Sequence, residues 1–87
     1  MNTIINNPKS YFKSEAEFYI FVLNYIDGPK RAELLGINEE LYLNTEKAYQ
    51  WKNEIFIRIN PRYCKIKGAK EAYEKLCQIY EHMIAID

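Results

Sequence analysis

The fold of this chain depends most on how residues 45–59 are interpreted. The end of this segment, EIFIRIN, alternates isoleucines with other residues, which is typical of a strand. Over the whole segment, apolar residues also recur at the helical steps of three and four, namely at Ala48, Trp51, Ile55 and Ile59. Length favours the helix, because the segment contains no Gly or Pro, Asn44 or Thr45 can cap its start, and Pro61 ends it.

A strand interpretation stays open as the alternative. The three strands would be residues 47–52, 54–59 and 63–67. Between two helices they would give the order found in double-stranded-RNA-binding domains, with phosphate contacts from Lys65, Lys67 and Lys70. Two observations disfavour this α+β fold: the hairpin would turn at Lys52-Asn53, which are poor turn residues, and the 12 basic residues are balanced by 12 acidic ones. Nucleic acid is therefore not the expected partner.

An apolar helix is predicted at residues 15–26. Ser14 and Glu17 have the spacing of a capping box at its start, and Asp27-Gly28 is expected to end it. The helix is apolar almost all round, so it must be buried against the rest of the domain or against a partner. A dimer formed through this helix is one such possibility.

A second, short helix is expected to begin at Pro29 and to end at Gly36, which suits a C-cap. Residues 37–44 then form a connection, in which Leu41 and Leu43 are expected to point inward.

The last helix is predicted at residues 69–85 from its amphipathic pattern. Its apolar face comprises Tyr73, Leu76, Ile79, Tyr80 and Met83. The 87 residues are enough for one domain, which is expected to be all-α and to span residues 14–87 behind a flexible arm at residues 1–13.

The composition predicts a soluble, cytoplasmic protein. Cys64 and Cys77 are the only cysteines, and a small secreted scaffold would usually carry more. The N-terminus lacks the charge pattern of a signal peptide, and the longest apolar run is too short to span a bilayer.

Three stretches, taken together, resemble a J-domain, the helical module by which co-chaperones engage DnaK-type chaperones. ELLGI at residues 33–37 is similar to the end of the family's first helix, and residues 43–62 resemble its long second helix and the loop after it. EAYEKLCQIYEHM at residues 71–83 is similar to the third helix. The resemblance covers residues 29–85 and implies an antiparallel helix pair.

The loop departs from the family pattern. Where a working J-domain has His-Pro-Asp, this chain has Asn60, Pro61 and Arg62, so only the Pro matches. The family's motif stimulates the ATPase of the chaperone, and the resemblance therefore implies a J-like domain that binds or modulates its partner without stimulating it. A purely structural interpretation is also open, because Asn and Pro are ordinary residues for ending a helix and forming a turn.

A run of basic residues without any acid surrounds this loop. It comprises Arg58, Arg62, Lys65, Lys67 and Lys70. In a J-domain the positive second helix and loop meet a negative surface of the chaperone, so these residues, with Asn60 and Pro61, are the candidate partner-binding site. Charges of this kind set encounter and register more than affinity. Alternatively, they only keep the surface hydrated.

No pattern of catalytic residues or cofactor ligands is present in the sequence. His82 is the only histidine, and Cys77 five residues earlier on the same helix does not face it properly. Phosphate-loop, zinc and calcium patterns are missing. We therefore expect a non-catalytic protein-interaction module without metal or cofactor, its partner being a DnaK-type chaperone or a J-protein. A small inhibitor or immunity-type protein with an unrelated protein target is the alternative.

Overall fold

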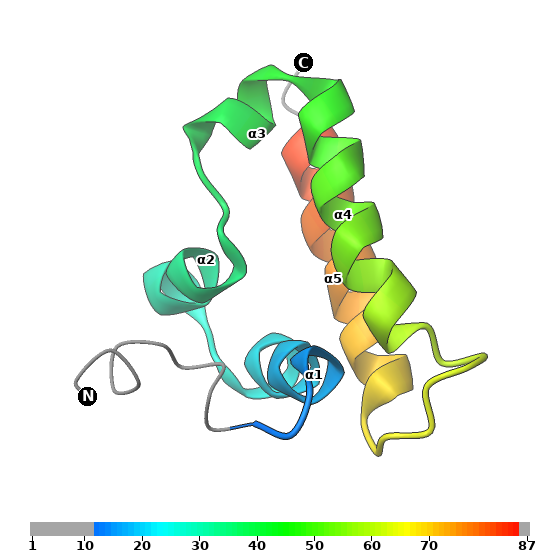
Figure 1. Cartoon of the computed structure of the whole chain (residues 1–87). Coiled ribbons are helices and arrows are strands. Elements are labelled where there is room, and N and C mark those ends of the chain that lie inside the picture. The colour runs from blue at the N-terminus through cyan, green and yellow to red at the C-terminus, as the bar shows by residue number, and fades with distance from the viewer. Residues whose placement is uncertain (1–11, 86–87) are drawn as a thin grey trace, which may run out of the picture.

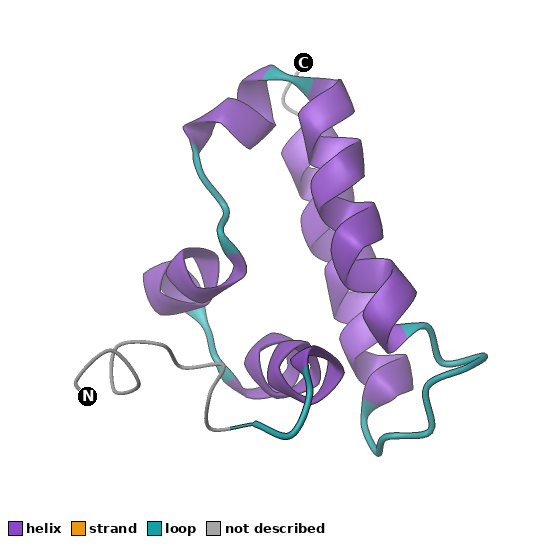
Figure 2. Ribbon diagram, in the orientation of Figure 1, coloured by secondary structure: helices purple, strands orange, loops and turns teal. Residues whose placement is uncertain are grey.

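The structure is a computed structural model that describes residues 12–85, and this part of the chain folds into five helices without any strand (Figures 1 and 2). The helices are α1 (Glu15–Tyr25), α2 (Gly28–Leu35), α3 (Glu39–Leu43), α4 (Thr45–Ile59) and α5 (Ala69–Ile84). The all-α prediction is confirmed. The arm predicted at residues 1–13 lies outside the described residues as far as residue 11.

The three-strand alternative is wrong, because residues 47–52 and 54–59 belong to one helix and residues 63–67 to a loop. The helical period decides the outcome: α4 buries Ala48, Ile55 and Ile59 on one face and leaves Ile57 69% exposed. A strand would have placed Ile55, Ile57 and Ile59 on the same face. The interpretation as a double-stranded-RNA-binding fold thereby loses its structural basis.

An antiparallel pair of helices, α4 and α5, forms the long axis of the molecule (Figure 1). Helix α1 packs on both of them near the end where the chain turns from α4 into α5, and α3 packs on both at the other end. Helix α2 packs against α1. The first apolar helix is therefore part of the core, and it packs on the pair more extensively than α2 does.

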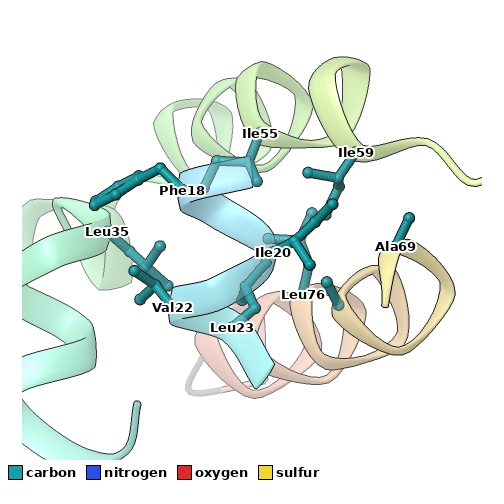
Figure 3. Packing of buried hydrophobic residues seen from close by; sticks show 10 residues of the cluster. Phe18, Ile20, Val22, Leu23, Leu35, Ile55, Ile59, Ala69 and Leu76 are labelled. Atoms are coloured by element: carbon teal, nitrogen blue, oxygen red, sulfur yellow. The ribbon is translucent and has the colours of Figure 1, made fainter. Parts of the chain in front are cut away.

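The main core lies where α1 meets the pair (Figure 3). Helix α1 contributes Phe18, Ile20, Val22 and Leu23, which are all at most 4% exposed. These side chains meet residues of α4 and α5, namely Ile55, Ile59, Ala69, Ala72 and Leu76. The expectation that α1 is buried is confirmed for this face, whereas Phe21 and Tyr25 on its outer side are 42% and 73% exposed.

A smaller core at the other end contains Leu41 of α3, Ala48 of α4 and Met83 of α5. Leu41 is buried as predicted, but the prediction for Leu43 is wrong, since its side chain is 79% exposed. Residues 39–43 form a helix whose Asn38 side chain accepts a hydrogen bond from Leu41 N, and only one of the two leucines can then face the pair.

The predicted apolar face of α5 packs toward the rest of the domain. Leu76 and Met83 are buried, and Tyr73, Ile79 and Tyr80 are partly buried. Ala69 and Ala72 were not predicted as core residues, yet they are 3% and 0% exposed. Their small side chains let α1 pack closely on this end of α5.

The helix starts follow the expected signals with two differences. The Ser14 hydroxyl accepts a hydrogen bond from Glu17 N at 3.1 Å, but the Glu17 carboxylate accepts from Lys13 N at 3.0 Å rather than from Ser14 N. Helix α1 ends at Tyr25, just before the predicted stop at Asp27-Gly28, but α2 begins at Gly28, one residue earlier than predicted. At the start of α4, the Asn44 side chain accepts from Glu46 N and Lys47 N, as one predicted cap would.

Trp51 of α4 attaches the end of α2 to the pair. Its Nε1 donates a hydrogen bond of 2.8 Å to the carbonyl oxygen of Leu35, which is one of the last carbonyls of α2 and would otherwise lack a helical partner. We expect Trp51→Phe to lower the free energy of unfolding by about 1.5 kcal/mol, because a half-buried carbonyl loses its donor. Urea unfolding followed by circular dichroism measures this loss.

The control for this substitution is Tyr49→Phe on the same helix, where the side chain is 52% exposed. This change should leave stability within about 0.5 kcal/mol of the original. Equal stability of Trp51→Phe and the unsubstituted protein would show that the hydrogen bond does not hold α2.

Candidate functional site

The loop that carries the predicted site, residues 60–68, begins with a tight turn. Asn60 caps the end of α4 with a ψ of 116°, the extended value that a following Pro imposes. Its side-chain oxygen accepts a hydrogen bond from Arg62 N at 3.0 Å, and its carbonyl oxygen accepts from Tyr63 N at 2.9 Å and Cys64 N at 2.7 Å. Asn60 and Pro61 therefore have a local structural role, as the turn interpretation predicts.

Four of the predicted basic residues project from this loop and the start of α5. Arg62, Lys65, Lys67 and Lys70 are exposed, and none of them forms an ion pair with a described residue. Between them, Cys64 and Ile66 are half-buried and pack against the main core. Along residues 62–70, exposed charged side chains thus alternate with side chains that hold the loop against the core.

Arg58 behaves differently from the other predicted site residues. It lies in the last turn of α4, where its guanidinium forms an ion pair with Glu15 of α1 and a hydrogen bond with the carbonyl oxygen of Glu54. Part of its charge is thus compensated within the protein. We regard Arg58 as the residue that connects α1 to the start of the loop rather than as a free cation.

The far end of the loop is also held by α1. Gly68 has a left-handed φ of 93°, and its carbonyl oxygen accepts a hydrogen bond of 3.0 Å from Asn24 Nδ2 of α1. Sequence reasoning missed this contact, because Asn24 sits in an apolar run and lies 44 residues from its partner. Only the left-handed preference of Gly was available as a signal at this position.

The remaining polar chemistry of α5 gives no sign of an activated nucleophile. A hydrogen bond and electrostatic interaction with the Cys77 thiol, together with burial, raise the pKa of the Tyr73 phenol above its usual value of 10.0. This is the opposite of the lowered pKa that an activated group needs. His82 lies near the C-terminal end of α5, away from the loop. The described residues contain no cluster of three side chains that could hold a metal ion.

An exposed strip on α4 was not anticipated as a surface. Tyr49 and Ile57 are 52% and 69% exposed, and with Asn53 between them they line one shallow hollow on the outer side of α4. The steps of four place the three residues on one side of the helix. Glu54 also lines this hollow, and Lys52 Nζ lies 5.3 Å from the centre of the Tyr49 ring, so the exposed Tyr and Ile are bordered by one acidic and one basic side chain.

Comparison of the chain with protein-family models, with curated protein sequences and with solved structures finds no significant match. No helix within residues 12–85 is both long and apolar enough to cross a membrane.

Proposed function

We propose that this protein is a non-catalytic protein-interaction module that binds an acidic surface of a partner protein through the loop between α4 and α5. The proposed contacts are Arg62, Lys65, Lys67 and Lys70. Pro61 and Asn60 fix the start of the loop, and Arg58 fastens it to α1. The observation that carries the proposal is the set of four exposed basic side chains without an acidic neighbour in an ion pair.

The proposed partner is a DnaK-type chaperone or a J-protein. Support comes from the three sequence stretches that resemble a J-domain, and from an antiparallel pair, α4 and α5, joined by a loop that contains Pro61. Because His and Asp are replaced by Asn60 and Arg62, the protein is proposed to modulate its partner without stimulating ATP hydrolysis.

The charge reversal Arg62→Glu tests the proposal. Binding to a purified DnaK-type chaperone and to a purified J-protein is measured by calorimetry at 50 and 300 mM salt. We expect one of these two proteins to bind, with a lower affinity at the higher salt concentration. Arg62→Glu should lower the affinity about tenfold or more, because the new carboxylate would face an acidic surface of the partner. ATP hydrolysis by the chaperone should not increase when the unsubstituted protein or its Arg62→Glu variant is added.

Lys30→Glu is the matched control, because Lys30 is an exposed lysine of α2 that lies outside the loop. It changes the net charge as Arg62→Glu does, so an effect of net charge alone would weaken partner binding equally in both variants. Strong stimulation of ATP hydrolysis would contradict the modulating role. Failure of both purified proteins to bind would remove the chaperone system as the partner.

A small inhibitor or immunity-type protein is the second candidate function, and the exposed Tyr49 and Ile57 on α4 favour it. Exposed Tyr and Ile side chains supply contact area for an unrelated protein target. Such a complex should lose affinity with Tyr49→Ala and Ile57→Ala, tolerate Arg62→Glu and depend little on salt.

A dimer through α1 would instead use its exposed Phe21 and Tyr25, whose rings lie 5.4 Å apart.

A further inference from the structure

A hollow of about 330 Å³ lies between α2, α3 and the C-terminal half of α5, away from the basic loop. Ile37, Ile79 and Ala32 supply apolar wall, and Tyr42 of α3 borders it. This volume is at the lower end of the range that small-molecule sites occupy. The hollow is open on one side, so a ligand could enter without rearrangement of the helices.

All charged groups of this hollow are basic. Arg31 from α2 and Lys75 from α5 line it together with His82, and no Asp or Glu is among the described residues that line it. Lys75 forms no ion pair with a described residue. Basic groups beside an apolar wall produce a local positive potential, because the wall screens them poorly.

The positive charge of Arg31 is only weakly compensated by its ion pair with Asp27. The Arg31 side chain is only 24% exposed, whereas the side chain of its ion-pair partner Asp27 is 97% exposed and lies 3.8 Å away. An exposed carboxylate at that distance contributes little. An anion inside the hollow could approach the guanidinium from the side of the apolar wall and accept charge-assisted hydrogen bonds from it.

We propose that this hollow binds a small organic anion, in which a phosphate or carboxylate group meets Arg31 and Lys75 and an apolar part lies against Ile37 and Ile79. His82 stands at the rim as a third donor. The site is independent of the loop, since none of its residues belongs to residues 58–70. The proposal therefore holds or fails separately from the proposed function.

The experiment uses phenyl phosphate as the probe, with His82 as the reporter. Because His82 is the only histidine, its ring protons give a single set of NMR signals in the full-length protein. At fixed pH and ionic strength, phenyl phosphate should shift these signals along a saturating curve with a Kd of about 1 mM, as expected for a ligand of this size. Phenol, which has the ring without the charge, should not produce a saturating shift.

Arg31→Gln and Lys75→Gln should each weaken the binding about tenfold, as expected for the loss of a charge-assisted hydrogen bond. Lys67→Gln in the loop is the control and should leave the Kd unchanged. Circular dichroism checks that each variant is folded, and Lys75→Gln alone decides the result if Arg31→Gln is not. A shift that never saturates, an unchanged Kd in the Lys75 variant, or an equal effect of phenol would overturn the proposal.

Discussion

Replacement of Gly68 by alanine is expected to lower the free energy of unfolding by about 3 kcal/mol. Two effects add up at this position. Gly68 has a φ of 93°, which side-chain-bearing residues rarely adopt, and a Cβ there would lie 2.9 Å from Asn24 Nδ2 and 3.3 Å from Ile20 Cγ2. Asn24 cannot move away without cost, because the same Nδ2 donates its hydrogen bond to the Gly68 carbonyl oxygen.

The matched control is Gly36→Ala. Gly36 also has a left-handed φ, of 74°, but a Cβ there would meet nothing within 4 Å. Its substitution should therefore cost only the backbone strain, about 1 kcal/mol. Chemical unfolding of both variants measures the difference. Equal losses at the two glycines would show that α1 does not pack closely on Gly68.

Phe18→Ala is expected to lower the free energy of unfolding by about 4 kcal/mol. Phe18 is 2% exposed and lies in the main core between α1 and its neighbours, and its ring meets those of Phe12 and Tyr19 edge-on. Truncation leaves a cavity that several helices share. For a chain of this size, such a loss is a large part of the total stability.

Leu43→Ala is the control for this prediction, since Leu43 is 79% exposed and its truncation should cost less than about 0.5 kcal/mol. Thermal unfolding of Phe18→Ala should remain one cooperative transition at a lower temperature, because α1 and the α4–α5 pair share one core. Loss of α1 in a separate, earlier transition would mean that the pair is stable by itself.

The sequence carried most of the information on the helices and little on how they pack. Capping residues and helical periodicity are local, so the start of α4 at Asn44 and its end before Pro61 could be predicted. The end of the first helix before Asp27-Gly28 was likewise predictable, although α2 begins at Gly28 and not at Pro29. Ala69 and Ala72 were missed as core residues because alanine carries a weak hydrophobic signal, and their burial depends on where α1 crosses α5.

The candidate site was predictable only as a set of charges. A run without acids can be recognised in the sequence, but the pairing of Arg58 with Glu15 joins residues 43 positions apart and depends on the tertiary structure. The same limit applies to the basic hollow, since Arg31 and Lys75 lie on two helices whose relative placement no periodicity predicts. His82 was considered only as a catalyst, and its position beside Arg31 and Lys75 becomes visible only in the fold.

Helix α1 holds the loop at both ends, through Arg58 before it and through Gly68 after it. The conformation of the loop thus depends on these two contacts and on the half-buried side chains of Cys64 and Ile66. The exposed side chains of the loop, such as those of Arg62 and Lys65, are expected to contribute little to stability. The residues that the proposed function uses are therefore different from those that hold the loop in place. In evolution, such a loop can vary at exposed positions such as Arg62 and Lys65 without a loss of stability that selection would have to repair.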